Sequence, residues 1–173
     1  MTLSNTHTID LGSLFEPAGV VVAGASSHPG KFGFAVLHNI ITCGYQGRVF
    51  ATNRNGGNLL GIECLTSVAQ VPAGQADLVY VCVPAAAVAQ VLRDAASVGI
   101  RAAFIASSGF GEGHDGEGAA HGAELAALAD ELGMVIAGPN GQGLVSTPVS
   151  LCAQFVGPFP PAGGVSIVSQ SGN

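Results

Sequence analysis

The sequence predicts an α/β fold, a doubly wound parallel sheet with helices on both faces. Hydrophobic residues make up 48% of the 173 residues, charged residues make up 9%, and 26 positions are glycine. An average soluble domain has about 25% charged residues, so this chain is unusually suited to burial on both faces of a sheet. Apolar runs that end at glycine alternate with helical periodicity at roughly 25 to 35 residues per unit, the spacing of right-handed βαβ crossovers. Together these observations predict a Rossmann-like architecture.

The first half of the chain contains two buried strands, one helix and an edge hairpin. A short turn is expected near Leu14, and Gly19–Ala23 is a β-branched run that ends in glycine, as a buried strand does. Apolar residues recur at helical spacing over Phe32–Cys43, and Gly44 supplies the stop. The remaining elements are a strand over Arg48–Thr52, a turn over Asn53–Gly57 and a small hairpin over Asn58–Glu63.

The second half continues the alternation. Asp77–Val83 is almost entirely apolar and is predicted as a strand. Pro84 opens the next helix at a position where its missing N–H costs nothing, and this helix extends to Ser97. After it we expect a strand over Arg101–Ala106, a polar glycine-rich loop over Ser107–Gly118, a helix over Ala119–Leu132 and a strand over Met134–Ala137.

These elements divide the chain into four parts. Residues 1–13 are a loose polar arm, and residues 14–146 form the Rossmann-like domain. Residues 147–164 contain four prolines, which is typical of a linker. Residues 165–173 start with the apolar run Val165–Val168 and continue into a Ser/Gly loop, so we interpret them as the first strand and loop of a second domain.

Composition and charge exclude several classes of partner. The net charge is −6, and the five Lys and Arg residues are too few for the basic face that a nucleic-acid backbone requires. The longest apolar run, Leu78–Ala89, is too short to span a bilayer, and the N-terminus has no signal-peptide pattern. The four cysteines form no CxxC pair, so we expect neither a metal site nor a disulfide. We predict a cytoplasmic protein that contacts neither membranes nor nucleic acid.

The loop after the first strand is the leading candidate for a ligand site. In open parallel sheets, ligands bind at the carboxyl ends of strands, where helix N-termini present N–H groups and a positive dipole. The loop has neither the GxGxxG spacing nor the P-loop spacing, since five residues separate Gly24 from Gly30. Lys31 is the only lysine in the chain, and a cation at a helix start is disfavoured unless an anion shares the site. We therefore favour phosphate binding, with an unliganded glycine-rich turn as the alternative.

The end of the second strand indicates which nucleotide is bound. NAD-binding proteins usually place Asp or Glu there to bind the ribose hydroxyls. Here the sequence continues from Thr52 into Asn53 and Arg54, with no carboxylate. An arginine suits a phosphorylated ribose, as in NADP or the 3′-phospho-ADP of coenzyme A. A solvated turn arginine is the alternative.

Three further loops give weaker signals. Val83 and Pro84 offer apolar contact for an adenine face or a pantetheine arm, although helix initiation alone would also explain Pro84. Ser107 and Ser108 offer hydroxyls, with a mobile solvent loop as the alternative. Asn140 suits a backbone cap and a ligand contact equally.

Several segments in a fixed order carry a family resemblance. They are Leu14–Pro17, Val22–Ser26, Lys31–Gly33, Val49–Asn53, Cys82–Ala85, Ser107–Glu112, Gly138–Asn140 and Val165–Gly172. In order and spacing they resemble the CoA-binding domain of the nucleoside-diphosphate-forming acyl-CoA synthetases, the superfamily that includes the succinyl-CoA synthetase α subunit. The resemblance covers nearly the whole chain from about Leu14.

The resemblance implies a reversible reaction in which acyl-CoA, phosphate and ADP exchange with free acid, CoA and ATP through a phosphohistidine. It implies that this chain holds CoA, that residues 165–173 begin a flavodoxin-like, succinyl-CoA-synthetase-like domain with the histidine, and that ATP or ADP and Mg²⁺ belong to an ATP-grasp domain or subunit. We assign no catalytic residue, expect this chain alone to be inactive, and expect a homo-oligomer to be possible. No histidine matches the phosphohistidine position among His7, His28, His38, His114 and His121.

With the resemblance, the sequence indicates fifteen cofactor-binding residues. Among them, His28 either touches a CoA phosphate or turns outward. The full set is Gly24, Ser26, Ser27, His28, Lys31, Phe32, Gly33, Asn53, Arg54, Val83, Pro84, Ser107, Ser108, Gly109 and Asn140.

Two positions depart from the family pattern. Many relatives have Asn-Pro-Lys after the second strand, whereas this chain has Arg54 after Asn53, which displaces the positive charge by one position. Relatives often have cysteine or serine after the Gly-Pro-Asn turn, near the thiol end of CoA, and here the residue is Gly141. The thiol pocket is therefore expected to differ in shape.

Two other functions remain open from the sequence. One is a stand-alone or regulatory CoA-binding module, for example attached to a protein acetyltransferase domain. The other is an NADP-dependent oxidoreductase, since Arg54 suits either phosphorylated ribose. Further coding sequence with a histidine-bearing domain and an ATP-grasp segment would favour the ligase.

Overall fold

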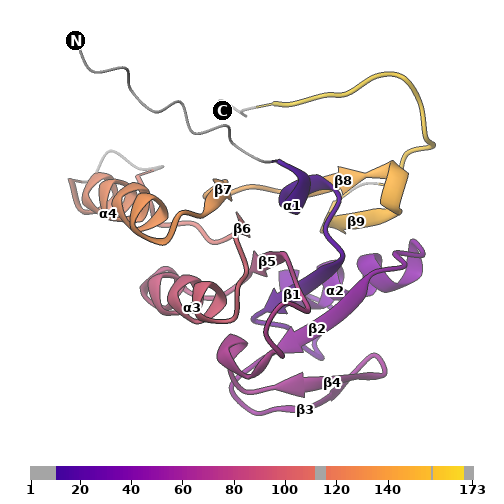
Figure 1. The fold of residues 1–173 in the computed structure, drawn as a ribbon, viewed down its shortest axis with the longest axis horizontal. Coiled ribbons are helices and arrows are strands. Elements are labelled where there is room, and N and C mark those ends of the chain that lie inside the picture. The colour runs from indigo at the N-terminus through magenta and orange to yellow at the C-terminus, as the bar shows by residue number, and fades with distance from the viewer. Residues whose placement is uncertain (1–10, 112–115, 157, 170–173) are drawn as a thin grey trace.

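The computed structural model describes residues 11–111, 116–156 and 158–169, and a seven-stranded sheet lies at its centre. The strands of this sheet are β1 (Gly19–Ala23), β2 (Arg48–Thr52), β3 (Gly57–Leu59), β4 (Ile62–Leu65), β5 (Leu78–Val81), β6 (Ala102–Ile105) and β7 (Val135–Ala137). Their order is β3-β4-β2-β1-β5-β6-β7, and every neighbouring pair is parallel except the β3–β4 hairpin (Figure 1). The predicted α/β fold is confirmed.

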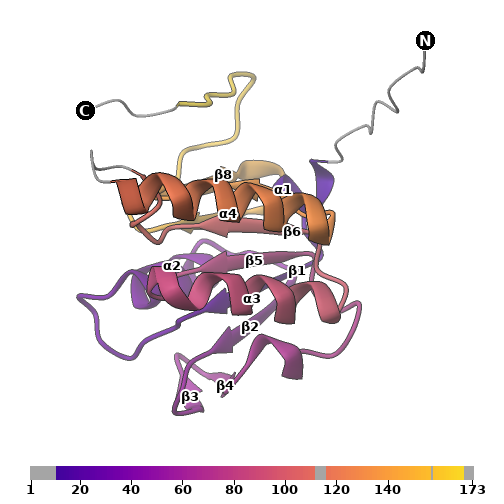
Figure 2. The same cartoon turned by 90° about the vertical axis from the view of Figure 1, so that its left-hand side faces the viewer.

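Helices cover both faces of the sheet. The helices are α1 (Gly12–Phe15), α2 (Phe32–Thr42), α3 (Ala85–Ser97) and α4 (Gly116–Leu132), with 3-10 turns η1 (Val68–Gln70) and η2 (Thr147–Val149). Helix α2 lies on one face, and α3 and α4 lie side by side on the other (Figures 1 and 2). Side chains of β1 alternate accordingly, since Val20 and Val22 join the core beneath α2 while Val21 joins the core beneath α3 and α4. Burial on both faces explains the unbroken apolar run of this strand.

Strand β1 is the point where the strand order reverses. It pairs with β2 on one side and with β5 on the other, in parallel on both. The helix after β1 crosses over one face and the helix after β5 crosses over the opposite face, so the two crossovers diverge at the carboxyl ends of these strands. Such a divergence opens a crevice in which open α/β sheets bind their ligands.

The predicted elements match the structure closely up to residue 137. Strands β1 and β2 have the predicted bounds, and α2 ends one residue before the predicted end, at Thr42. The predicted hairpin is the β3–β4 pair. Helix α4 begins at Gly116, earlier than the predicted Ala119, so the glycine-rich loop is shorter than expected. Residues 112–115 of that loop lie outside the described residues, as do residues 1–10 of the predicted arm.

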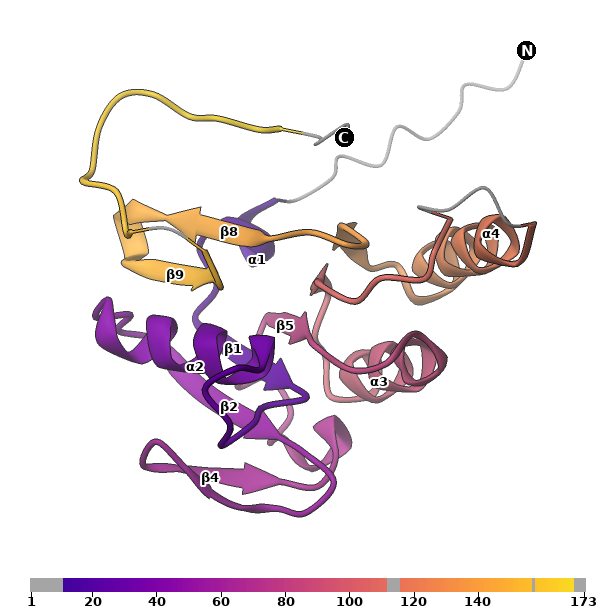
Figure 3. The same ribbon diagram turned by 180° about the vertical axis from the view of Figure 1, so that it is seen from behind.

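The predicted linker over residues 147–164 differs from the structure in its first part. Residues 143–154 form a second, two-stranded antiparallel sheet of β8 (Gly143–Ser146) and β9 (Leu151–Gln154). Strand β9 packs against α2 and is buried at Leu151 and Cys152 (Figure 3). Pro148 lies in the turn between the two strands, where a proline disrupts no ladder hydrogen bond. A proline that suggests a linker in the sequence therefore belongs to a hairpin.

The strand predicted over Val165–Val168 is not formed among the described residues. The side chains of Val165, Ile167 and Val168 are 85%, 85% and 93% exposed. A strand requires a neighbour that bonds its N–H and C=O groups, and the described part of the chain supplies none here. The assignment of residues 165–173 to a second domain stays a prediction.

Candidate functional site

A cavity of about 870 Å³ opens at the carboxyl ends of β1, β2, β4 and β5. Its walls come from the loops after these strands and from the helices α2 and α3. The lining residues are Gly24, Ser26, Gly30, Lys31, Phe32, Gly33, Thr52, Asn53, Arg54, Thr66, Ser67, Val68, Cys82, Val83, Pro84, Ala87, Gln90, Val91 and Asp94. Nine of the fifteen predicted site residues lie in this wall, so the loops after the first, second and third predicted parallel strands do converge.

The loop after β1 forms the floor of the cavity through close backbone contacts. The N–H groups of Gly24 and Ala25 both donate to the Thr52 carbonyl, at 2.9 and 3.0 Å. A Cβ on Gly24 would lie 2.6 Å from the Cys82 carbonyl oxygen, and a Cβ on Gly33 would lie 2.1 Å from the Gly24 carbonyl oxygen. Glycine at both positions therefore lets α2 begin directly on the strand, and it leaves the helix N-terminus at the cavity wall.

The segment between these glycines folds onto itself. The Ser26 hydroxyl accepts a hydrogen bond from the His28 N–H at 3.0 Å, and His28 Nδ1 accepts one from the Gly30 N–H at 3.1 Å. Ser26 lines the cavity, whereas Ser27 and His28 are exposed and do not. His28 is thus exposed and bonded within its own loop, and its contact with a CoA phosphate stays a prediction.

Two cations and one carboxylate set the charge of the cavity wall. Lys31 is the N-cap residue, immediately before the first residue of α2, and the first turn of this helix contains no acidic residue. Arg54 lies at the tip of a turn in which the Asn53 side-chain oxygen accepts the Asn55 N–H at 2.7 Å. Within the described ranges, neither cation forms an ion pair. With the α2 dipole, they make this end of the cavity suited to an anion.

The carboxylate, Asp94, is already engaged by neighbouring side chains. Its two oxygens accept hydrogen bonds from the Ser67 hydroxyl and the Gln90 amide, both at 2.7 Å. These bonds hold the carboxylate between Ser67, in the loop after β4, and Gln90, one turn earlier on α3. Its charge is therefore partly compensated where it stands.

The remaining wall is apolar. Val83 and Pro84 lead into α3, and Val68 and Val91 face them from the loop after β4 and from the helix. Pro84 is the N-cap residue of α3. Its φ is −56° and its ψ is 147°, so the backbone is still extended just before the first helical residue. This surface can take a flat ring or a flexible chain but offers few polar groups.

Cys82 lies in the same wall, and its thiol is unreactive as a nucleophile. Burial raises the pKa of its thiol to about 12, so the thiol stays protonated near neutral pH. Because the thiolate is the nucleophile, this cysteine contributes packing and not covalent chemistry.

We expect the raised pKa of Cys82 to make the fold sensitive to alkali. A thiol has a pKa of about 8.5 when unfolded, so its stabilising contribution is complete below that value and is lost as the pH rises toward about 12. Urea unfolding under reducing conditions should show a Cys82→Ala variant losing about 2 kcal/mol less than the parent between pH 7.5 and pH 10. Equal losses for the two proteins would show that this thiol titrates normally.

Four predicted residues, in the loops after β6 and β7, do not line the cavity. The Ser107 hydroxyl donates to the Val83 carbonyl, and the Ser107 carbonyl accepts the Asn140 N–H at 2.9 Å. Asn140 has φ +54°, a left-handed conformation that asparagine tolerates better than most residues. Ser108 and Gly109 are exposed. The backbone N–H of Asn140 is thus engaged within the fold, and a ligand contact by its side chain stays a prediction.

Sequence reasoning missed the wall formed by the loop after β4 and by α3. Ser67 and Gln70 form a capping box at η1, and the Ser-x-x-Gln spacing was a signal that could have placed this loop. Gln90, Val91 and Asp94 lie on the side of α3 that faces the cavity. No local pattern identifies that side, because it depends on how the helix crosses the sheet.

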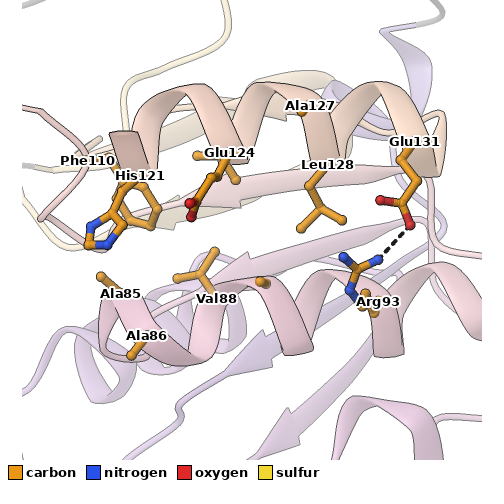
Figure 4. Close-up of a pocket in the computed structure, with 12 residues that line it drawn as sticks. Ala85, Ala86, Val88, Arg93, Phe110, His121, Glu124, Ala127, Leu128 and Glu131 are labelled. Atoms are coloured by element: carbon orange, nitrogen blue, oxygen red, sulfur yellow. Dashed lines mark hydrogen bonds and ion pairs between the residues drawn. The ribbon is translucent and has the colours of Figure 1, made fainter. Parts of the chain in front are cut away.

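A second cavity of about 470 Å³ lies between α3 and α4 (Figure 4). Phe110 and His121 lie at one end, and an ion pair between Arg93 and Glu131, 2.7 Å long, lies at the other. Both charged partners are about half exposed. Apolar side chains of both helices, such as Val88 and Leu128, lie between these ends.

No helix among the described residues is long and apolar enough to cross a membrane. All four cysteines are free. Within the described ranges, no group of three His, Cys, Asp or Glu side chains lies close enough to hold a metal ion.

Known proteins match the chain over most of its length. A family model described as a CoA binding domain matches residues 19–146. The chain is 37% identical to the Pyrococcus furiosus acetate–CoA ligase [ADP-forming] I subunit alpha, over 95% of the chain and 36% of that protein. It is 34% identical to the Archaeoglobus fulgidus acetate–CoA ligase [ADP-forming] II, over 94% of the chain and 24% of that protein.

A solved structure agrees with these relatives. The dinucleotide forming acetyl-coenzyme A synthetase 1 of Ca. Korarchaeum cryptofilum, in complex with phosphate and ADP, superposes with a TM-score of 0.81 and 34% identity, over 90% of this chain and 32% of that chain. The chain thus spans between 24% and 36% of the length of these relatives. Since the family model covers more than half of it, the chain belongs to the CoA binding domain family.

Proposed function

We propose that this chain binds CoA in the cavity at the carboxyl ends of β1, β2 and β5, and that it is the CoA-binding domain of an ADP-forming acid:CoA ligase. The observation that carries the proposal is the position of Lys31 and Arg54 in the wall of one cavity, beside the N-terminus of α2. CoA carries a diphosphate and a separate 3′-phosphate on one adenosine. Two cations on neighbouring loops match this pair of anionic groups.

Each part of the wall has a proposed role toward CoA. Lys31 and the first-turn N–H groups of α2 hold the diphosphate, while Arg54 holds the 3′-phosphate. Gly24 and Gly33 let α2 begin directly on β1, which leaves the N-terminal N–H groups of the helix at the cavity wall to meet the phosphates. The apolar surface at Val83, Pro84 and Val91 contacts the adenine or the pantetheine arm. Contacts of CoA with Ser107, Ser108, Gly109 and Asn140 stay a prediction.

The chemistry of the complete enzyme is proposed to take place outside this chain. In the reaction, acyl-CoA, phosphate and ADP are converted reversibly into free acid, CoA and ATP. This chain binds and orients CoA, and a phosphohistidine domain, together with an ATP-grasp domain or subunit that binds ATP or ADP and Mg²⁺, supplies the rest. The greater length of the ligase relatives supports these partners. The exposed apolar segment at Val165–Val168 supports a further domain that begins there.

The relatives named above do not favour the regulatory module or the NADP-dependent oxidoreductase. The relatives named above carry ligase or synthetase names, and Arg54 suits the 3′-phosphate of CoA as well as it suits NADP. A homo-oligomer and a cytoplasmic location stay predictions.

Calorimetry with CoA and dephospho-CoA tests the proposed phosphate contacts. Lys31→Ala and Arg54→Ala should each weaken CoA binding about tenfold, and the double variant about a hundredfold, since a charge-assisted hydrogen bond is worth about 1.5 kcal/mol or more. The parent should prefer CoA over dephospho-CoA, which lacks the 3′-phosphate, by about tenfold. Arg54→Ala should remove this preference while Lys31→Ala keeps it.

Arg48→Ala is the matched control. Arg48 is an exposed residue at the opposite end of β2 from Arg54, so its replacement removes one positive charge without touching the cavity. It should leave both affinities within twofold of the parent. If the double variant at Lys31 and Arg54 binds CoA as tightly as the parent, the assignment of the cavity is wrong.

A further inference from the structure

An exposed aromatic ring in the cavity wall is held in place from outside the cavity. Phe32 is the first residue of α2 and lines the cavity, yet its side chain is 53% exposed. The ring stacks on Phe155, with centroids 4.1 Å apart and planes within 14° of parallel. A large apolar side chain this exposed has several rotamers open to it unless a neighbour restricts it. Phe155 is that neighbour.

The backbone around Phe155 is fixed on two sides. The Phe155 N–H donates to the Gln142 carbonyl at 3.4 Å, just before β8. The carbonyl of the preceding Gln154 accepts a hydrogen bond from the Asn39 side chain on α2 at 2.8 Å. Phe155 therefore directly follows the β8–β9 hairpin, and this hairpin packs against α2 (Figure 3). Its ring does not line the cavity but stacks on Phe32, which does.

The position of Phe155 in the chain gives this contact a second consequence. Residues 158–169 lie just beyond it, and Val165, Ile167 and Val168 in that segment are highly exposed. The chain thus leaves the domain directly after the residue whose ring supports the wall of the cavity. Phe155 therefore links this segment, along the chain, to the stacked pair at the cavity wall.

We infer that Phe155 is a positioning residue for coenzyme binding, which couples the segment after β9 to the cavity through its stacking on Phe32. The inference rests on the proposed function. The ring of Phe155 holds Phe32 across the first turn of α2, next to Lys31. Lys31 and the helix N-terminus therefore have the same arrangement before and after the coenzyme binds. Binding then carries no entropic cost for ordering this wall.

A double-mutant cycle with CoA as the ligand tests the inference. Phe155→Ala should weaken CoA binding about three- to tenfold, the range expected for one stacked aromatic pair. Phe155→Tyr keeps the ring and should bind within twofold of the parent. In a Phe32→Ala background, Phe155→Ala should have no further effect on affinity. A merely structural role for Phe155 would instead weaken binding by the same factor in both backgrounds.

Val156→Ala is the matched control, because Val156 is the exposed neighbour of Phe155 and does not line the cavity. Affinities are compared at least 10 °C below the unfolding midpoint of each variant. If the parent binds CoA and Lys31→Ala weakens it while Phe155→Ala does not, the inference is overturned and the proposed function stands. If the parent binds no CoA, both are overturned.

Discussion

Gly33→Ala is expected to destabilise the protein by about 3 kcal/mol and to abolish measurable CoA binding. The added Cβ would lie 2.1 Å from the Gly24 carbonyl oxygen and 3.1 Å from the Ala25 Cα. Both neighbours are backbone atoms of the loop after β1, and that loop is held by two hydrogen bonds to Thr52. Neither neighbour can rotate away, so the start of α2 must move off the strand. Overpacking of this kind costs about 1–3 kcal/mol and occasionally more.

Helix propensity alone predicts the opposite sign. Gly33 lies inside α2, where alanine is favoured over glycine by about 1 kcal/mol. The clash is larger than this gain, and the result distinguishes the two effects directly. For a domain of this size, about 3 kcal/mol corresponds to a fall of roughly 6–12 °C in the unfolding midpoint.

The matched control for Gly33 is Gly163→Ala. Gly163 has no atom within 4 Å of an added Cβ, and it lies in the exposed segment after β9. This variant should keep the unfolding midpoint within about 1 °C of the parent, since surface substitutions usually stay within 0.5 kcal/mol. A Gly33→Ala protein that is as stable as the parent and binds CoA normally would show that α2 does not need this close contact.

The sheet was predictable because its signals are local. The β-branched run at Gly19–Ala23 and the run at Arg48–Thr52 are bounded by turn residues, and both strands have the predicted bounds. The switch-point rule then placed the ligand at the strand ends without any knowledge of side-chain geometry. The convergence of Lys31 and Arg54 on one cavity follows from the parallel pairing of β1 with β2.

The hairpin β8–β9 was not predictable in the same way. Its strands are four residues each, and their pairing brings Val145 opposite Cys152. Nothing within either segment shows that partner, and the prolines that follow suggested a linker. The burial of Leu151 and Ala153 comes from α2, which lies more than a hundred positions earlier in the chain. Such contacts are set by tertiary packing, which overrides local composition.

Gly141→Ser is expected to destabilise the protein by about 2 kcal/mol, although the family that the sequence resembles often has serine after the Gly-Pro-Asn turn. An added Cβ would lie 2.5 Å from Phe104 Cζ and 3.0 Å from Cε1. The Phe104 ring is 6% exposed and stacks on Tyr80, with centroids 4.9 Å apart. Because the ring is buried and stacked, the new side chain overpacks the core. In this chain, the ring of Phe104 fills the volume that a side chain at position 141 would use.

Positions 104 and 141 should therefore be energetically coupled. Phe104→Leu alone removes ring atoms and should cost about 1–2 kcal/mol, but it also opens space beside Gly141. The double variant Phe104→Leu with Gly141→Ser should therefore be at least 1 kcal/mol more stable in urea unfolding than the sum of the single effects predicts. Leu92→Ala, in the core on the opposite face of the sheet, should combine additively with Gly141→Ser. If Phe104→Leu and Gly141→Ser were also strictly additive, the size of the Phe104 ring would not explain why this chain has glycine at position 141.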